Sequence, residues 1–282
     1  MGDLAKQLIR ATEKLSAAVN PLRAKLKGFA GVEVVYNPLD YALEPYKKYL
    51  EKFGEKQNRV LLVGMNPSYD GMTQTGIPFG DEKFVTEGMA LDITNNDLDQ
   101  DKIPDNPDGF IIDGFNHKKE ENSGKKLRAL IEGMYQTKKN KSKVEQFFDK
   151  YFVINYCPLA FLKKTQKDKI ANVSLATFVE QSQIGLRKLF TACNQYLLRV
   201  IAELEPKYVI GIGKEADRCI KSAICGGLVF RISHPSYVKE KDWVPETIDR
   251  LKSFHNIYSR TDSTLLTNFH EWVKSCVAKL KP

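Results

Sequence analysis

The stretch that decides the fold is residues 59–80, which read RVLLVGMNPSYDGMTQTGIPFG. It opens with a short continuous apolar run, Arg59 to Val63, and passes directly into a loop rich in glycine and proline. Such a run is typical of a strand that is buried on both faces in a parallel sheet. The loop contains no lysine and is therefore not a P-loop, but it is suited to present backbone N–H groups and a few fixed side chains to a ligand.

Three further apolar runs have the same character, and each is followed by a polar or glycine-containing loop. They are YFVI at residues 151–154, YVIGI at 208–212 and LVFRI at 228–232. Helical patterns, with apolar residues at steps of three and four, occur at 124–135 and 178–204. Strands that alternate with helices predict a layered α/β fold with a parallel sheet. Because ligands of such sheets bind beyond the carboxyl ends of the strands, we expect the four loops to converge on one crevice.

The amino-terminal part of the chain is expected to be helical over residues 3–27, with an apolar stripe and a break at Pro21. The next apolar run, Val32 to Tyr36, ends at an Asn-Pro pair, which predicts a strand followed by a turn. We expect both elements to belong to a single domain that spans residues 1–282.

An acidic segment interrupts the pattern of strands and helices. Residues 92–108 contain six aspartates, three asparagines and two prolines, which predicts a solvated, mobile loop inserted within the domain. Towards the carboxyl end, residues 245–280 are expected to form two further helices.

The charge of the chain is basic and unevenly distributed. Lys and Arg number 43 against 35 Asp and Glu, a formal net charge of +8. The surplus lysines gather at 118–119, 125–126, 138–143 and 163–169. Clustered lysines suit a polyanionic partner such as nucleic acid, although a well-solvated lysine-rich surface would have the same composition.

Five cysteines and four histidines show no spacing typical of a metal site or a disulfide framework. We therefore expect no metal, no cofactor and a reducing, intracellular compartment. No stretch approaches the roughly 20 apolar residues that cross a bilayer, and the start of the chain lacks a secretory apolar core, so we expect no membrane partner.

Asn66 and Phe79 are the candidate ligand-binding side chains of the glycine-rich loop. Asn66 offers an acceptor and two donors, and Phe79 offers a stacking face; the alternative is a tight turn that Asn66 caps, with Phe79 in the core. Cys157 has no partner base nearby in the sequence and is expected to be a small core residue and not a nucleophile. The segment GIGKEA, Gly211 to Ala216, lacks the third glycine of a dinucleotide fingerprint, which favours a strand-to-helix turn.

Four segments in order give the sequence a family resemblance. GMNPSYDGMTQTGIPFG, Gly64 to Gly80, is similar at the same length to the signature loop of single-strand-selective monofunctional uracil-DNA glycosylases. VVYNPLDYALEPYKKYL from Val34, FVINYCPLAFL from Phe152 and SHPSY from Ser233 resemble three further motifs of that family. The resemblance covers roughly residues 32–242 and implies a three-layer α/β/α uracil-DNA glycosylase fold around a central four-stranded, mostly parallel sheet.

The resemblance also implies hydrolysis of the N-glycosidic bond of uracil in single- and double-stranded DNA, which initiates base excision repair. The target base must leave the DNA stack and enter a pocket. Phe79 matches the residue on which the base stacks, and Asn155 matches the amide that pairs with the uracil edge. Gly64 and Met65 match positions that contact the base through their backbone.

The same resemblance assigns two catalytic residues. His234 matches the donor that stabilises the negative charge developing on the uracil O2, and Asn66 matches the residue that positions the attacking water. An amide orients water but hardly deprotonates it, so the reaction depends on departure of a stabilised uracil anion. Because no lysine is among the residues matched to the family's base-binding and catalytic positions, none is placed to form a Schiff base, and we expect no lyase activity.

The sequence departs from the family in the signature loop, where Ser68, Tyr69 and Asp70 replace Gly-Pro-Phe. The resemblance places Ser68 near the C5 edge of the base, with a bulk between that of glycine and that of the tyrosine that excludes thymine in uracil-only glycosylases. We therefore expect uracil to be accepted, thymine to be rejected, and 5-hydroxymethyluracil to be cleaved less readily than is usual for the family.

The second departure is a shorter loop after the SHPSY motif, where the family carries a longer wedge into the duplex. Ser236, Tyr237 and Val238 are expected to contact DNA here, with Tyr237 or Val238 as the wedge. Lys239 and Lys241 are expected to touch phosphates. A shorter wedge would favour single-stranded or destabilised targets.

Two other classes of function remain open at the level of the sequence. One is a protein of the same fold that binds nucleic acid without catalysis, and the other is a metabolic enzyme that binds a nucleotide through Gly211 to Gly213. For a glycosylase we expect a monomer in the nucleus of a eukaryote or the cytoplasm of a bacterium.

Overall fold

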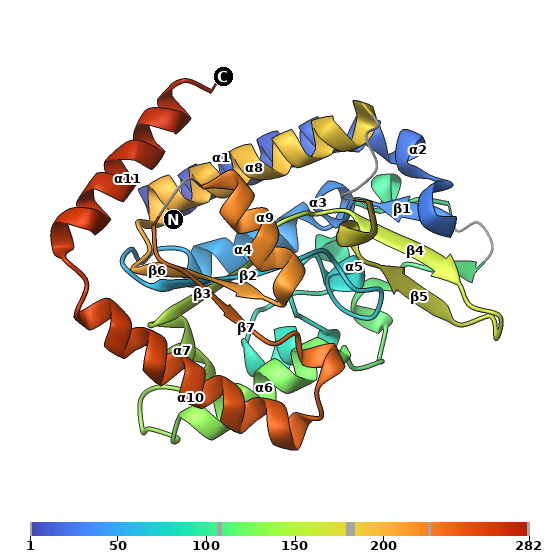
Figure 1. Ribbon diagram of the computed structural model, residues 1–282. Helices are drawn as coiled ribbons and strands as arrows, with labels where there is room; N and C mark the ends of the chain where they lie inside the picture. The colour runs from blue at the N-terminus through green and yellow to red at the C-terminus, as the bar shows by residue number, and fades with distance from the viewer. Residues whose placement is uncertain (1, 106–108, 179–183, 225–226, 281–282) are drawn as a thin grey trace.

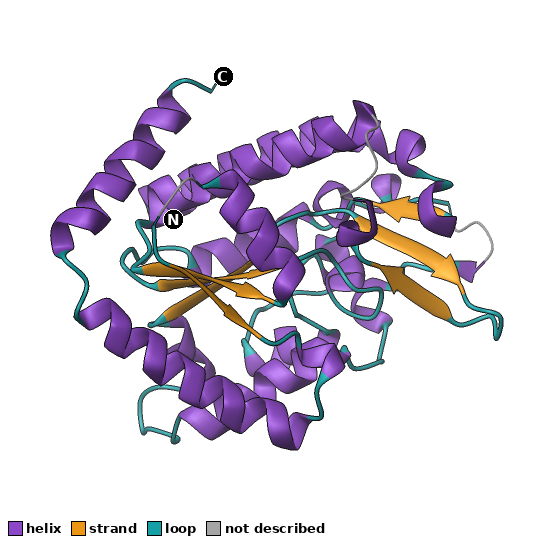
Figure 2. Ribbon diagram, in the orientation of Figure 1, coloured by secondary structure: helices purple, strands orange, loops and turns teal. Residues whose placement is uncertain are grey.

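The computed structural model describes residues 2–105, 109–178, 184–224 and 227–280. Its centre is a four-stranded sheet of β2 (Val60–Gly64), β3 (Tyr151–Asn155), β6 (Tyr208–Ile212) and β7 (Val229–Ile232) (Figures 1 and 2). The strands lie in the order β3-β2-β6-β7, and every neighbouring pair is parallel. The four strands predicted from the apolar runs are confirmed, and all four end at the same edge of the sheet.

Helices cover both faces of this sheet, which gives the predicted three-layer α/β/α arrangement. Figure 1 shows α1 (Asp3–Val19), α8 (Ile184–Leu204) and α9 (Lys214–Ala223) on one side. On the other side lie α6 (Asn122–Met134) and α10 (Glu240–Ser259), which pack against each other. Apolar side chains at helical steps bury the inner face of α8: Leu186, Leu189, Cys193, Leu197, Val200, Ile201 and Leu204.

The remaining helices connect these layers or extend them. They are α2 (Arg23–Leu26), α3 (Pro38–Tyr41), α4 (Leu43–Phe53), α5 (Met72–Thr75), α7 (Lys143–Phe148) and α11 (Ser263–Ala278). No helix in the described part of the chain is long and apolar enough to span a membrane.

A second, smaller sheet lies beside the first and is antiparallel. It consists of β1 (Val34–Tyr36), β4 (Ala160–Lys164) and β5 (Ile170–Val173), in the order β1-β4-β5. The sequence predicted only the first of these strands. The lysine-rich segment that joins β4 to β5 masks the apolar alternation that would identify a hairpin.

The break predicted at Pro21 is confirmed: a short 3₁₀ turn, Asn20–Leu22, separates α1 from α2. Two other segments differ in detail from the expectations. The acidic segment is held to the protein over its described part, 92–105: the Lys48 Nζ lies 2.6 Å from Asp97 Oδ1, and Leu98 is buried. Helix α10 begins at Glu240, five residues before the predicted start at Pro245, so this proline lies inside the helix.

Candidate active site

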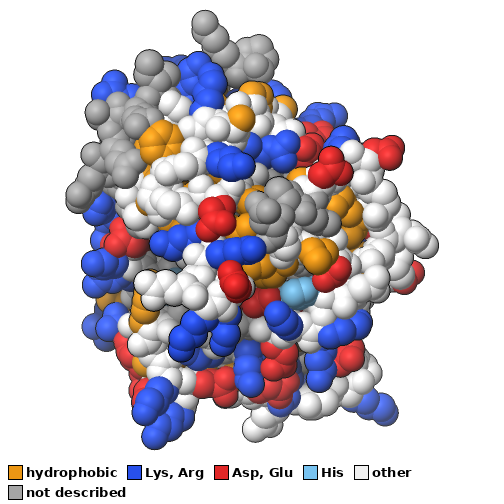
Figure 3. All heavy atoms as spheres, turned by 90° about the vertical axis from the view of Figure 1, so that its right-hand side faces the viewer, with side chains coloured by type: hydrophobic (Ala, Val, Ile, Leu, Met, Phe, Trp, Pro, Cys, Tyr) orange, Lys and Arg blue, Asp and Glu red, His pale blue; other side chains and the backbone are white. Residues whose placement is uncertain are grey.

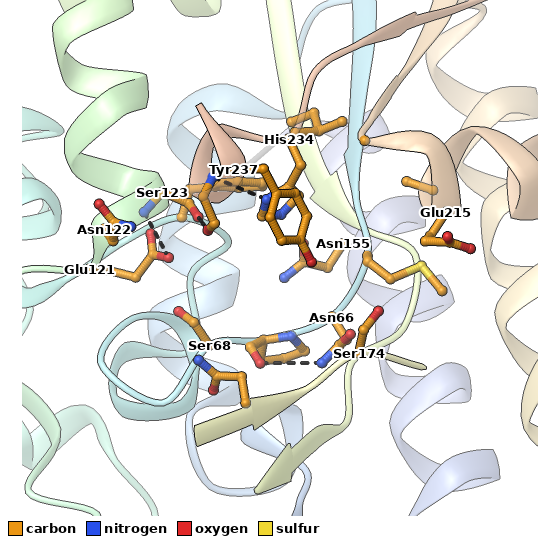
Figure 4. A pocket seen from close by; sticks show the side chains of 18 of the residues that line it. Asn66, Ser68, Glu121, Asn122, Ser123, Asn155, Ser174, Glu215, His234 and Tyr237 are labelled. Atoms are coloured by element: carbon orange, nitrogen blue, oxygen red, sulfur yellow. Dashed lines mark hydrogen bonds between the residues drawn. The ribbon is translucent and has the colours of Figure 1, made fainter. Parts of the chain in front are cut away.

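A cavity of about 920 Å³ opens beyond the carboxyl ends of the four parallel strands. Each strand or the loop after it supplies a lining residue: Asn66 after β2, Asn155 at the end of β3, Gly213 after β6 and His234 after β7. Phe79, from the same glycine-rich loop as Asn66, also lines the cavity. The crevice predicted from the four strand ends is therefore present, and Figure 4 shows its side chains.

Gly64 makes room for the ring and the amide in the depth of the cavity. It lies opposite Asn155 in the parallel register of β2 and β3. A side-chain carbon at Gly64 would stand 2.7 Å from Phe79 Cε2 and would also collide with Asn155 Oδ1. Only glycine lets the aromatic ring and the amide approach this strand so closely.

Phe79 has an unusual backbone conformation for an aromatic residue. Its φ is +59°, in the left-handed region, and its side chain is nearly buried. A non-glycine residue held in this region costs on the order of 1–3 kcal/mol, and such strain concentrates at functional sites. Asn155, beside it, donates from Nδ2 to Met72 Sδ over 3.2 Å, which fixes the plane of its amide.

Asn66 is held by the last residue of β5 and by the segment that follows this strand. Its Nδ2 donates to the Val173 carbonyl over 3.3 Å, and its Oδ1 accepts from the Leu175 N–H over 3.1 Å. These two bonds define which atom of the amide is oxygen and which is nitrogen. Because an amide oxygen has two lone pairs, Oδ1 keeps one acceptor position for another ligand.

His234 is a neutral imidazole with a defined tautomer. The Ser236 N–H donates to His234 Nδ1 over 3.2 Å, so the ring proton is on Nε2. Burial, with a smaller effect of the Lys126 charge, lowers the pKa of His234 to about 4. At neutral pH the ring therefore offers one N–H donor and carries no charge.

Helix α6 holds the loop after His234 in place. The buried Lys126 donates to the carbonyls of Pro235 and Val238, over 2.5 Å and 2.6 Å. The hydroxyl of Ser123 lies 3.1 Å from that of Ser236. The loop is thus tied at three points to one rigid helix.

The five residues predicted to contact DNA after His234 fall into two groups. Ser236, Tyr237 and Val238 line the cavity, and Tyr237 is 86% exposed, with its ring centroid 5.4 Å from that of His234. Lys239 and Lys241 are exposed but do not line the cavity.

A sequence model of the uracil DNA glycosylase superfamily matches residues 51–252, which include all these residues. The chain belongs to the uracil DNA glycosylase superfamily.

Similar proteins and a similar structure agree with this membership. A rat protein named single-strand selective monofunctional uracil-DNA glycosylase is 31% identical over 197 residues, or 69% of this chain and 64% of the rat protein. The match thus spans less than two thirds of that relative's length. A bovine protein of the corresponding name is 28% identical over 209 residues, 73% of this chain and 70% of its own. The crystal structure of SMUG2 from Pedobacter heparinus shares the fold, with a TM-score of 0.57 at 15% identity over 86% of this chain and 98% of that one.

The main residue that sequence reasoning missed in this superfamily member is Glu121. It is 6% exposed, lines the cavity and caps α6, where it accepts from the N–H groups of Ser123 and Gly124. Burial raises the pKa of Glu121, and the hydrogen bonds from these two N–H groups, with the nearby hydroxyls of Ser68 and Ser123, oppose that rise. Glu121 lies in the segment HKKEENSGKK, whose charged composition is typical of a solvated surface. The only signal in the sequence is its position just before a helical pattern, where a residue can cap the helix.

The strand β5 also contributes residues that the sequence did not indicate. Asn172 and Ser174 line the cavity beside Asn66 and Ser68. Figure 4 shows Ser174 close to Asn66, while Glu121 and Ser123 lie on another side of the cavity. One wall therefore comes from the small antiparallel sheet, which explains why reasoning from the parallel strands alone left it out.

Two other sequence interpretations are settled by packing. Cys157 is fully buried, as expected for a core residue. The GIGKEA segment is a strand-to-helix turn in which Gly213, with φ +90°, precedes α9. A side-chain carbon at Gly211 would lie 2.5 Å from the Asp217 nitrogen, so this glycine serves the contact between β6 and α9.

Proposed function

We propose that this protein is a monofunctional DNA glycosylase that hydrolyses the N-glycosidic bond of uracil in single- and double-stranded DNA and so initiates base excision repair. The observation that carries the proposal is the presence of Asn66, Phe79, Asn155 and His234 around one cavity at the strand ends. The names of the rat and bovine relatives support the same activity.

Recognition begins when the uracil nucleotide leaves the DNA stack and enters the cavity. Unstacking costs a few kcal/mol, and stacking on the ring of Phe79 returns about 1–3 kcal/mol. The amide of Asn155 offers a donor and an acceptor together, which complements the O4 and N3–H of uracil. Cytosine presents a donor where uracil has O4, so the same amide disfavours it.

His234 stabilises the charge that develops on the base. As the bond between C1′ and N1 breaks, its electron pair moves to the uracil ring and raises the charge on O2. The neutral ring of His234 donates its Nε2–H to that oxygen, since Nδ1 is occupied by the Ser236 N–H. A positioned donor of this kind contributes about 10²–10³ in rate.

Water completes the reaction at C1′ of the sugar. The free acceptor position on Asn66 Oδ1 orients the water, while the bonds to Val173 and Leu175 keep the amide from rotating. The water oxygen bonds to C1′ and its proton is lost to solvent, because an amide is not a base. The products are free uracil and an abasic sugar in an intact strand.

Release of uracil without cleavage of the strand distinguishes this activity from that of a lyase. The one lysine among the lining residues identified in the described chain is Lys214, whose side chain is 78% exposed at the rim. It lacks the burial that would turn an ammonium group into a nucleophile at neutral pH. We therefore assign it no covalent role.

A direct test uses a single-stranded oligonucleotide with one uracil. After incubation, half of the sample is treated with alkali: we expect cleavage at the uracil only in the treated half. Asn66→Ala and His234→Leu should each lower the release rate by about 10²-fold or more. Binding of the oligonucleotide without release of uracil would contradict the proposal, and cleavage without alkali would contradict the monofunctional assignment.

A further inference from the structure

The hairpin of β4 and β5 carries four lysines within seven residues: Lys163, Lys164, Lys167 and Lys169. None of the four forms an ion pair with another residue of the described chain. By contrast, Lys141 and Lys143 of another lysine cluster pair with Asp149 and Glu132. Against these four lysines the hairpin, residues 160–173, has one acidic residue, Asp168, so its formal net charge is +3.

The turn of the hairpin is fixed by internal hydrogen bonds. Thr165 N donates to the Lys169 carbonyl over 2.8 Å, and the Thr165 hydroxyl accepts from the N–H groups of Lys167 and Lys169. Asp168 takes a φ of +53°, as the tight reversal requires. The four ammonium groups are therefore carried on an ordered support, which lowers the entropic cost of binding a ligand.

The second strand of the hairpin leads directly into the cavity. Lys164 lies opposite Ile170, and side chains two residues apart share a face of a strand, so Lys164, Ile170 and Asn172 project from the same face. Asn172 lines the cavity, and its Oδ1 accepts from the Tyr69 N–H over 2.7 Å. At about 3.3 Å per residue, Ile170 and the Lys164 paired with it stand roughly 7 Å from Asn172 along the strand. Lys163, which pairs with Ala171, belongs to the other face of the hairpin.

We propose that the β4–β5 hairpin binds the phosphates of the DNA strand that continues on one side of the extruded nucleotide. The inference rests on the proposed function, because the cavity fixes where that nucleotide sits. Ser236 and Tyr237 occupy another wall of the cavity, so the hairpin extends the binding surface away from that loop. Figure 3 views the side of the protein on which β4 and β5 lie and shows Lys and Arg side chains across it, with acidic ones among them.

The test compares two variants with the same change of net charge. The first variant replaces the hairpin lysines by Gln: Lys163, Lys164, Lys167 and Lys169. The second replaces by Gln four lysines of the other cluster: Lys138, Lys139, Lys141 and Lys143. Each phosphate contact with a single strand contributes about 0.7 to the slope of log Kd against log salt. For uracil-free single-stranded DNA, we expect the slope of the hairpin variant to be smaller than that of the wild type by about 1–3. The other variant should have the wild-type slope.

Position-dependent substrates test the direction of the strand. Oligonucleotides carry the uracil near the 5′ end or near the 3′ end, so that one side of the extruded nucleotide lacks neighbours. At 150 mM salt we expect the hairpin variant to lose about tenfold or more in kcat/KM on one arrangement only, with kcat at saturating DNA unchanged. An equal loss on both arrangements, or an unchanged slope, would overturn the inference.

The two proposals fail in different ways. If the wild-type protein releases no uracil from any substrate, the proposed function is wrong. If it releases uracil and the hairpin variant has the wild-type salt slope, only the role of the hairpin is wrong. Thermal unfolding of both variants shows whether each of them is folded under the conditions of the binding and activity measurements.

Discussion

His234 determines how activity should depend on pH. Its lowered pKa of about 4 keeps the ring neutral through the range where an ordinary histidine titrates. Protonation of Nδ1 would place its N–H opposite the N–H of Ser236, and two donors repel each other. We expect kcat/KM for uracil release to stay constant from pH 8 to about pH 5 and to fall through about pH 4.

The same group affects stability in a defined direction. Between about pH 4 and pH 6.5 the unfolded chain binds a proton at His234 and the folded chain does not, so this residue stabilises the fold above pH 6.5 and progressively less as the pH falls. An activity profile with a midpoint near 6.5, which His234→Leu abolishes, would contradict the neutral, buried state.

Gly64 should be sensitive to the smallest enlargement. In Gly64→Ala the added methyl group meets Phe79 and Asn155, so ring and amide must shift. We expect uracil release to fall by at least about tenfold, because displacements of 1 Å at a reacting site cost up to about 10²-fold. Gly185→Ala is the control, since the nearest atom to its added carbon is 3.8 Å away; equal activity of the two variants would refute the steric role.

Ser68 should set the preference at the C5 edge of the base. Its side chain lines the cavity beside Glu121, and both side chains border Gly71. On one oligonucleotide sequence we expect uracil to be released fastest, 5-hydroxymethyluracil more slowly and thymine not at all. Ser68→Gly should raise the rate for 5-hydroxymethyluracil relative to uracil. Faster release of 5-hydroxymethyluracil than of uracil by the wild-type protein would refute this order.

Helix α6 acts on the chemistry through a single buried ammonium group. In Lys126→Met the carbonyls of Pro235 and Val238 lose their donor, and the positive charge near His234 disappears. We expect kcat to fall by about tenfold or more and the acid limb of the pH profile to move upward from pH 4. The neighbouring Lys125, exposed on the same helix, provides the control Lys125→Met. If kcat falls but the acid limb of the pH profile stays near pH 4, Lys126 acts only by holding the loop in place and not through its charge.

The elements differ in how far the sequence reveals them. The strands at 60–64, 151–155 and 208–212 are buried on both faces, so their apolar runs identify them without reference to tertiary structure. The edge strand at 229–232 is buried only at Ile232, but its run of apolar residues still identifies it. The hairpin of β4 and β5 is half-exposed, and its lysines outweigh its apolar positions. Its pairing with β1 depends on contacts between residues more than 100 positions apart, which no local pattern reports.

The site shows the same division between local and distant information. Asn66, Phe79, Asn155 and His234 stand in recognisable motifs at strand ends, so family resemblance located them and the structure places them around one cavity. Glu121 and Asn172 reach that cavity from a lysine-rich loop and from the second sheet. Their contribution depends on how the two sheets and α6 are arranged, and that arrangement is a property of the folded chain.

At the scale of the whole molecule, the buried cation Arg59 connects the start of β2 to the carboxyl ends of α4 and α7. Arg59 is 5% exposed, and its guanidinium donates to the carbonyls of Lys56, Phe53 and Phe148 at the ends of different elements. Replacement by methionine would leave these carbonyls without their donor, and each buried unsatisfied group costs about 1–3 kcal/mol.

We therefore expect Arg59→Met to lower the free energy of unfolding by about 2–4 kcal/mol in urea titrations. Uracil release per folded molecule should be unchanged, because Arg59 is not among the residues that line the cavity. Lys56→Met serves as the control, since the Lys56 side chain is 55% exposed. A stability equal to that of the wild type would show that water replaces the guanidinium at these carbonyls.

Two of the hydrogen bonds of Asn66, those to Val173 and Leu175, restrict which side chains can replace it. The side chain joins the parallel sheet to the backbone after β5 with one donor and one acceptor. A carboxylate would supply a general base for the water, but it would also turn an oxygen towards the Val173 carbonyl, where two acceptors repel. Replacing Asn66 by a carboxylate would therefore also require the antiparallel sheet to move away from this position. The strength of the water-activating group is in this way coupled to how the two sheets are joined.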